Sequence, residues 1–154
     1  MIRDMRRNGA QPKDTMHKAE VAMVTGMGVV IKDAAYVALP GAETADNIYV
    51  ATKERVPVGC HAALKDMSDY HEDFVKIAAN EFIGLERYTD GEKFATDQYK
   101  AVDFEAEAGF PVSVGADGKW MKAAVPSRYI YEGIHMDNGH KLVVIRVEAE
   151  KVTV

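Results

Sequence analysis

Residues 128–147 read RYIYEGIHMDNGHKLVVIRV, and this stretch decides the fold. Two runs rich in β-branched and aromatic residues, 128–135 and 141–147, flank the pair Asn138-Gly139. Asn and Gly tolerate the positive φ angles that a two-residue hairpin turn requires, and the flanking composition is typical of strands. The stretch therefore predicts a β-hairpin.

Two further turn signals, Asp90-Gly91 and Asp117-Gly118, precede this hairpin. Each separates two strand-like runs, which are residues 82–88, 93–99, 110–114 and 119–125. The same reasoning predicts a hairpin at each turn. Three hairpin signals in the C-terminal half predict a mainly β chain, folded as a compact antiparallel domain with at most one short helix.

The run 141–147 carries apolar side chains on both of its faces. Leu142 and Val144 lie on one side of an extended chain, and Val143 and Ile145 lie on the other. Strands of this kind are buried on both faces, so we expect a central strand or one packed against a partner.

The N-terminal half holds shorter strand-like runs, which are residues 20–24, 28–32, 36–39 and 48–52. Gly26 and Gly28 resemble the start of a dinucleotide-binding fingerprint, but Ile31 stands where its third glycine belongs and no helix pattern follows. A bend or bulge between strands is the better interpretation. The stretch 65–81 fits helix and strand periodicity alike, and we expect a short helical turn near 67–72 followed by extended chain.

Length and composition are those of one folded domain. The chain has 154 residues, of which 47% are apolar and 28% charged, as in ordinary globular proteins. No stretch approaches the roughly 18 apolar residues of a membrane span, and Met1–Arg7 lacks the apolar run of a secretory signal. We therefore expect the chain to act where it is made, with residues 19–154 forming a single β-rich domain.

Residues 1–18 differ from the rest of the chain in charge. They carry a net charge of +3 within a chain of net charge −5, which leaves −8 on the remainder. Gly9 and Pro12 interrupt any regular element, so we expect an extended basic arm. Such an arm on an acidic body suits contact with an acidic partner surface or with nucleic acid, and a solvated, flexible tail is the alternative. The cations assigned to this contact are Arg3, Arg6, Arg7, Lys13 and Lys18.

Signals for catalysis, metal or cofactor binding are weak. Cys60 beside His61 would point to opposite faces of a strand, which favours a structural cysteine. His135 and His140 could approach across the hairpin, but the local sequence offers no third metal ligand. The sequence contains no nucleophile elbow and no phosphate-binding loop. We expect no catalytic residues, no metal and no cofactor.

An acidic cluster and an aromatic set each have a plainer explanation. The cluster lacks the glycine and ligand alternation of a calcium loop, so a solvated acidic face is expected for Asp66, Asp69, Glu72 and Asp73. The aromatic residues could stack on nucleic-acid bases, but the acidic body opposes phosphate binding. Trp120 is the best candidate for an anchor in a protein interface, since Trp is enriched in hot spots.

A resemblance to a known class of proteins runs through the second half of the chain. It is carried by Glu81–Tyr88, Asp90–Tyr99, Gly109–Val114 and Asp117-Gly118-Lys119. This pattern resembles the capsid decoration (cement) proteins of tailed bacteriophages, over roughly residues 70–150. The resemblance is one of overall pattern and includes no diagnostic motif.

The resemblance implies a structural protein of the virion, not an enzyme. It implies a compact antiparallel β-barrel or β-tulip-like domain on the outer capsid surface. This domain would cement adjacent major capsid protein subunits, with the arm reaching a neighbouring subunit. The implied partners are the major capsid protein and further copies of the chain, without membrane or direct nucleic-acid contact. A small β-barrel that binds a ligand or a host surface stays open as the alternative.

Overall fold

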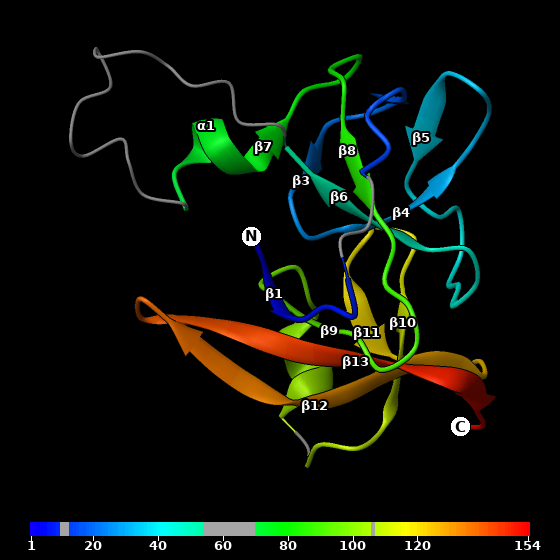
Figure 1. The fold of residues 1–154 in the computed structure, drawn as a ribbon, viewed down its shortest axis with the longest axis vertical. Coiled ribbons are helices and arrows are strands. Elements are labelled where there is room, and N and C mark those ends of the chain that lie inside the picture. Colours follow the sequence, from blue (N-terminus) through cyan, green and yellow to red (C-terminus); the bar gives the residue numbers. More distant parts are fainter. Residues whose placement is uncertain (10–12, 54–69, 106) are drawn as a thin grey trace.

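The computed structural model describes residues 1–9, 13–53, 70–105 and 107–154, and it is built mainly of β-strands (Figure 1). Within the described residues, helical structure is limited to α1 and to η2, a single 3-10 turn. The elements in chain order are β1 (Ile2–Arg6), β2 (Lys18–Ala19), β3 (Met23–Val24), β4 (Gly28–Ile31), β5 (Tyr36–Ala38), β6 (Tyr49–Thr52), α1 (Glu72–Val75), β7 (Lys76–Ile77), β8 (Gly84–Glu86), β9 (Lys93–Thr96), η2 (Ala101–Phe104), β10 (Pro111–Val114), β11 (Trp120–Lys122), β12 (Ser127–Asp137) and β13 (His140–Val152). The predicted mainly β fold class is confirmed.

The larger sheet has six strands in the order β1-β9-β13-β12-β10-β11. The predicted hairpin between β12 and β13 is confirmed: Asp137 pairs with His140, and Asn138 and Gly139 have φ angles of 48° and 83°. The hairpin around Asp117-Gly118 is confirmed as well, since β10 pairs with β11. β13 lies between β9 and β12, so its predicted central position is also confirmed.

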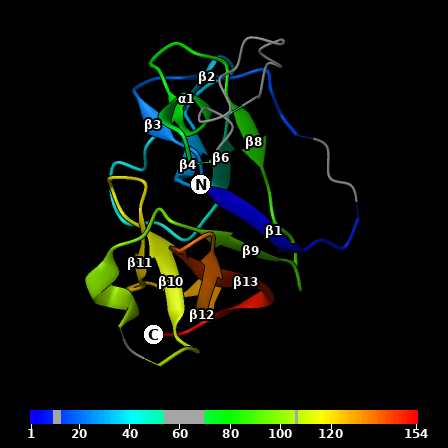
Figure 2. The same cartoon turned by 90° about the vertical axis from the view of Figure 1, so that its left-hand side faces the viewer.

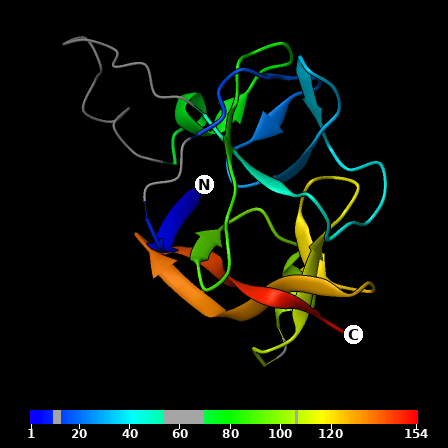
Figure 3. The same ribbon diagram turned by 45° about the vertical axis from the view of Figure 1, so that its right-hand side comes forward.

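The smaller sheet has five strands in the order β2-β5-β4-β6-β8 and curls on itself (Figure 3). Residues that precede β2 run along the far side of β8. There Asp14 and Leu85 exchange backbone hydrogen bonds of 3.2 and 2.7 Å, and Lys18 forms a bridge with Phe82. Because β2 also pairs with β5, these contacts link the two edges of the sheet into a small barrel and leave few backbone groups unpaired at either edge.

Two hydrophobic clusters share the strand β6. Val50 belongs to the cluster that packs against the six-stranded sheet, whereas Ala51 belongs to the cluster inside the barrel. Successive residues of a strand point to opposite faces, so one strand can contribute to both clusters. The first cluster is Ile48, Val50, Tyr88, Phe94, Phe104, Val112, Val114, Trp120, Tyr129, Tyr131, Val143, Ile145 and Val147. The second is Ala19, Met23, Val29, Val37, Ala51, Ile77, Ile83 and Leu85.

Gly26 and Gly28 lie where the barrel packs on the six-stranded sheet. Gly26 has a φ of 96°, and its carbonyl accepts hydrogen bonds from the Thr96 hydroxyl and the Trp120 indole. A Cβ on Gly28 would lie 2.3 Å from Cγ2 of Val114. The predicted bend is confirmed, and the glycines serve close backbone packing.

The predicted hairpin around Asp90-Gly91 is wrong. Gly91 does form a turn, with φ 76°, but β8 pairs with β6 in the barrel while β9 pairs with β1 and β13. The reason is burial in two different cores: Leu85 packs inside the barrel and Phe94 inside the larger cluster. The turn therefore connects the two sheets.

Residues 1–9 and 13–18 lie within the folded body, where the sequence suggested an arm that leaves it. β1 pairs with β9 along the edge of the larger sheet (Figure 2), and residues 14–18 close the barrel. Met1 is 6% exposed and Ile2 packs against the larger cluster, so apolar burial at the start of the chain holds this segment down.

Two regions of prediction fall partly or wholly outside the described residues. Residues 67–69 of the expected helical turn at 67–72 lie there, and the helix that the structure describes in this region is Glu72–Val75, followed by the extended β7. Cys60, His61, Asp66 and Asp69 also lie outside the described residues.

Candidate interaction site

The β12–β13 hairpin extends beyond the rest of its sheet (Figure 1). Among the described residues, β10 pairs with β12 only at Tyr129 and Ile130, and β9 pairs with β13 only over Val143–Arg146. Residues 133–142, which we call the hairpin tip, therefore form a two-stranded projection. An isolated two-stranded ribbon is marginally stable in water, so the tip requires support from elsewhere.

A cluster of four side chains from three chain segments supplies this support. Asp137 accepts a hydrogen bond of 2.8 Å from the Tyr70 hydroxyl and one of 2.7 Å from Nε of Arg3. The Tyr70 ring stacks on His140, with centroids 3.8 Å apart and an interplanar angle of 13°. We call Arg3, Tyr70, Asp137 and His140 the clasp, because they fasten the turn of the hairpin to β1 and to the chain before α1.

The hydrogen bonds of the clasp shift the pKa values of Asp137 and Tyr70. The Arg3 guanidinium, followed by the Tyr70 hydroxyl, holds the pKa of Asp137 below its usual value. Burial, together with the hydrogen bond to the Asp137 carboxylate, raises the pKa of Tyr70. Asp137 is therefore ionised and Tyr70 is a neutral donor around neutral pH, which is the pairing that the geometry requires.

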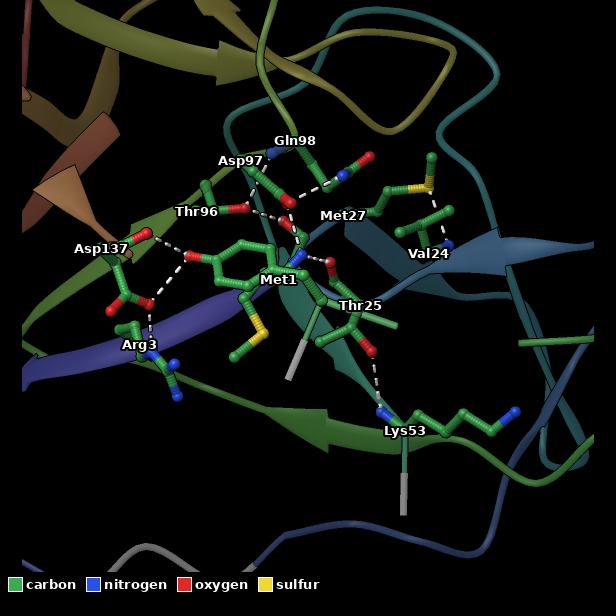
Figure 4. Close-up of polar contacts among 12 residues, drawn as sticks. Met1, Arg3, Val24, Thr25, Met27, Lys53, Thr96, Asp97, Gln98 and Asp137 are labelled. Atoms are coloured by element: carbon green, nitrogen blue, oxygen red, sulfur yellow. Dashed lines mark hydrogen bonds and ion pairs between the residues drawn. The ribbon is translucent and has the colours of Figure 1, made fainter. Parts of the chain in front are cut away.

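The start of β1 is fixed beside the clasp (Figure 4). The Met1 amino group donates to the Thr25 carbonyl at 2.7 Å and contacts the Asp97 carboxylate, while the Asp97 amide donates to the Met1 carbonyl at 3.3 Å. Burial lowers the pKa of this amino group, an effect that Asp97 partly opposes. These contacts set the position of β1 and thereby of Arg3.

The face of the hairpin tip opposite the clasp is apolar and exposed. Ile134 and Met136 are 43% and 54% exposed and lie on one face, since they are two residues apart in a strand. His135 and Asp137 point to the other face, toward the clasp. The tip thus presents two apolar side chains on a scaffold that is fastened from behind.

A second polar cluster ties the other end of β1 to β8. The Tyr88 hydroxyl contacts carboxylate oxygens of Asp4 at 2.5 Å and of Glu86 at 3.0 Å. Lys13 pairs with Glu86 at 2.8 Å, and the Arg7 guanidinium lies 4.2 Å from the centroid of the Tyr88 ring. Burial and the neighbouring Glu86 raise the pKa of Tyr88, so its hydroxyl acts as a hydrogen-bond donor and not as a phenolate.

A cavity of about 500 Å³ opens between β1, the barrel and α1. Its walls include Arg3, Lys13 and Lys53 together with Glu86 and Phe74. The volume lies in the range of small-molecule sites. The cations in its wall are engaged with carboxylates, because Arg3 pairs with Asp137, Lys13 with Glu86 and Lys53 with Glu81.

The sequence-predicted contact residues divide between internal contacts and the surface. Arg3 belongs to the clasp, Arg7 lies over Tyr88 and Lys13 pairs with Glu86. Arg6 is exposed on β1, and the Lys18 ammonium lies 5.0 Å from the centroid of the Phe82 ring. The structure therefore does not gather these five cations in one patch, and their contact with a partner stays a prediction.

Trp120 is not available as an interface anchor. Its exposed fraction is 0%, it packs against Phe94 and Tyr129, and its indole N–H donates to the Gly26 carbonyl at 3.2 Å. A tryptophan in a strand-like run fits an interface hot spot and a buried core position equally well in the sequence. The packing of Trp120 shows that it is a core residue.

The predicted pair His135 and His140 does not face across the hairpin. His135 pairs with Leu142 and His140 with Asp137. Over the described parts of the chain, no group of three metal-ligating side chains occurs, and no helix is long and apolar enough to cross a membrane.

The sequence singled out Arg3, His135 and His140 and predicted the hairpin turn, but it predicted neither the clasp nor the exposed apolar face of the hairpin tip. Ile134 and Met136 alternate with polar neighbours, which is the signal that could have marked an exposed apolar face. Tyr70 carries no such signal, since it meets the hairpin from 67 residues away in the chain.

No protein-family model, no curated protein and no solved structure matches the chain.

Proposed function

We propose that the chain is a structural protein that decorates the outer surface of a tailed-phage capsid and cements adjacent major capsid protein subunits against the pressure of the packaged DNA. The observation that carries the attachment mode is the hairpin tip. It projects from the body, exposes Ile134 and Met136 on one face, and is fastened by the clasp on the other. A projection with exposed apolar side chains is suited to contact with another protein.

The clasp gives the tip the rigidity that such contact needs. Side chains that are already ordered lose little entropy on binding, so a modest interface retains more of its interaction energy. Met136 adds an adaptable apolar side chain that can fit an irregular pocket. Two apolar residues supply a small contact, and repetition over many sites on a shell gives it a large collective effect.

A decoration protein stabilises a shell by binding only its assembled state. Binding of this kind shifts the assembly equilibrium by mass action, and the shift grows with the free concentration of the ligand. This mechanism needs a stable surface and no catalytic group.

Co-sedimentation with emptied tailed-phage capsids tests the proposal. We expect saturable binding of the unaltered chain at a fixed ratio to the shell subunit. The double variant Ile134→Ser, Met136→Ser should lose it, whereas the control Val154→Ser, at a position 66% exposed, should bind normally. Equal binding by the double variant would place the attachment elsewhere, and absence of binding by the unaltered chain would overturn the capsid role.

The contribution of the basic segment needs a point variant. Deletion of residues 1–18 would remove β1 and the segment that closes the barrel, so loss of binding would report loss of the fold. Arg6→Glu changes an exposed side chain in β1 and keeps the backbone ladder. A weaker association with capsids would support a role for this edge in reaching a neighbouring subunit.

A second candidate function, a ligand-binding or host-surface-binding barrel, is favoured by the cavity of about 500 Å³ beside β1. This second function would be supported if the chain bound no capsid shell but was stabilised by a small polar compound. Thermal denaturation in the presence of a panel of sugars, amino acids and nucleotides measures that stabilisation.

A further inference from the structure

The outer surface of the barrel carries an apolar and basic patch at the place where the chain closes it. Met16 and Phe82 are 77% and 56% exposed, and Lys18 forms a bridge with Phe82 and lies over its ring. Their chain neighbours Ala19 and Ile83 are fully buried, so Lys18 and Phe82 point outward. We call Met16, Lys18 and Phe82 the seam.

The seam has a cation without a carboxylate partner. Within the described ranges, Lys18 forms no ion pair, and its recorded side-chain contact is the one with Phe82. Two large exposed apolar side chains, one on each side of the Lys18–Phe82 bridge, together with such a cation indicate a contact surface for an apolar and acidic partner.

The turn η2, with the residue at its C-terminal end, presents an exposed apolar side chain and an exposed carboxylate. Val102 is 75% exposed, and Glu105, three residues later, is exposed and has no ion pair among the described residues. Side chains three residues apart in a 3-10 turn lie on the same side. Phe104 anchors the turn, since it is 5% exposed and packs against Tyr131 at a centroid distance of 5.0 Å.

These two surfaces lie at opposite ends of the molecule. In Figure 2, β2 is at the top of the view with the barrel, and η2, the short yellow-green helix, is at the bottom beside the six-stranded sheet. Figure 1 shows the same separation from another side. One copy therefore cannot bring its own seam to its own η2.

We infer that the seam of one copy binds η2 of a second copy. Lys18 then meets Glu105, and Phe82 and Met16 cover Val102. The charges select this arrangement over a two-fold pairing of seam on seam, which would bring one Lys18 against another. A head-to-tail contact of this kind repeats and produces closed rings or chains. The inference concerns the chain alone and does not depend on a shell.

Charge exchange between the two surfaces tests the contact. Sedimentation velocity of the unaltered chain at low salt should show mass that grows with concentration, and high salt should weaken the association. Lys18→Glu and Glu105→Lys should each weaken it about tenfold or more. An equimolar mixture of the two variants should associate again, since one variant keeps Lys18 and the other keeps Glu105.

Two matched controls make the same charge changes elsewhere. Lys119→Glu and Glu150→Lys alter exposed side chains outside both surfaces and should associate like the unaltered chain. The inference is overturned if the unaltered chain stays monomeric throughout, if either surface variant associates normally, or if the mixture of variants stays monomeric. These outcomes are independent of capsid binding, because no capsid is present.

Discussion

The six-stranded sheet and the small barrel are built in different ways. The sheet contains strands of up to 13 residues, two hairpins between neighbours in sequence, and a core rich in aromatic rings. The barrel is made of strands of two to four residues, and its core is mainly aliphatic. The barrel also depends on residues 14–18 for its closure.

This difference teaches where stability and specificity come from in each half. A long hairpin pairs residues that are close in sequence, so its ordering entropy is modest. The barrel joins residues about seventy positions apart, such as Asp14 and Leu85, and gains stability only once the whole ring is formed. Because β6 contributes to both cores, we expect the halves to unfold together.

Removal of the Trp120 indole from the core of the six-stranded sheet should have the largest effect on stability. Trp120→Ala should lower the free energy of unfolding by about 3–5 kcal/mol, because it empties a fully buried site and removes the indole hydrogen bond. Urea denaturation followed by circular dichroism measures the loss. Val154→Ala, at a position 66% exposed, is the control, and a loss below about 1 kcal/mol for Trp120→Ala would contradict the packing described.

A cavity created in the barrel core should also destabilise the six-stranded sheet. Leu85→Ala should cost about 2–5 kcal/mol, since Leu85 is 1% exposed within the barrel. Trp120 is the single tryptophan of the chain, and its fluorescence reports on the six-stranded sheet. We expect fluorescence and circular dichroism to shift to the same lower urea midpoint. A fluorescence midpoint that stays at its original value would show that the halves unfold separately.

The junction of the halves should tolerate no added methyl group at Gly28. Gly28→Ala should cost about 1–3 kcal/mol, because the new Cβ overlaps the Val114 side chain. Gly41→Ala is the matched control, since a Cβ at Gly41 meets nothing within 4 Å, and it should stay within about 0.5 kcal/mol. Equal thermal midpoints for the two variants would contradict the close approach at Gly28.

The clasp should contribute less than the cores. Tyr70→Phe keeps the stack on His140 and removes the hydroxyl that donates to Asp137, so we expect a loss of about 0.5–1.5 kcal/mol. Hydrogen exchange of the amides of residues 133–142 should become faster, while exchange in β9 stays as it was. Unchanged exchange in the hairpin tip would mean that the tip is held by other contacts.

The pH dependence of the clasp should be the smallest effect, since Asp137 lies near the surface. Its pKa is lowered in the folded chain by Arg3 and Tyr70. The stabilisation is therefore complete above about pH 4, the range of the unfolded carboxyl, and is lost as the pH falls through the folded pKa. The urea midpoints of the unaltered chain and of Asp137→Asn should differ at neutral pH and converge in acid. A difference that persists in acid would contradict this origin.

The tertiary structure also corrected two plausible expectations, and the reasons are physical. Asp90-Gly91 has the composition of a hairpin turn, but its flanking strands bury Leu85 and Phe94 in different cores. The basic residues 1–18 have the composition of an extended arm, but Met1 and Ile2 pack against the folded body. Local composition does not encode which distant surface a segment meets.

From the amino-acid sequence alone we predicted the mainly β class, the hairpins at Asn138-Gly139 and Asp117-Gly118, the central place of β13 and the bend at Gly26 and Gly28. These features depend on turn chemistry and on the two-residue period of strands, which act between close neighbours. Only the tertiary structure decided the closure of the barrel, the burial of Trp120 and the clasp behind the hairpin tip. Those features join residues such as Tyr70 and Asp137, 67 positions apart, and their contacts arise from packing that no local pattern specifies.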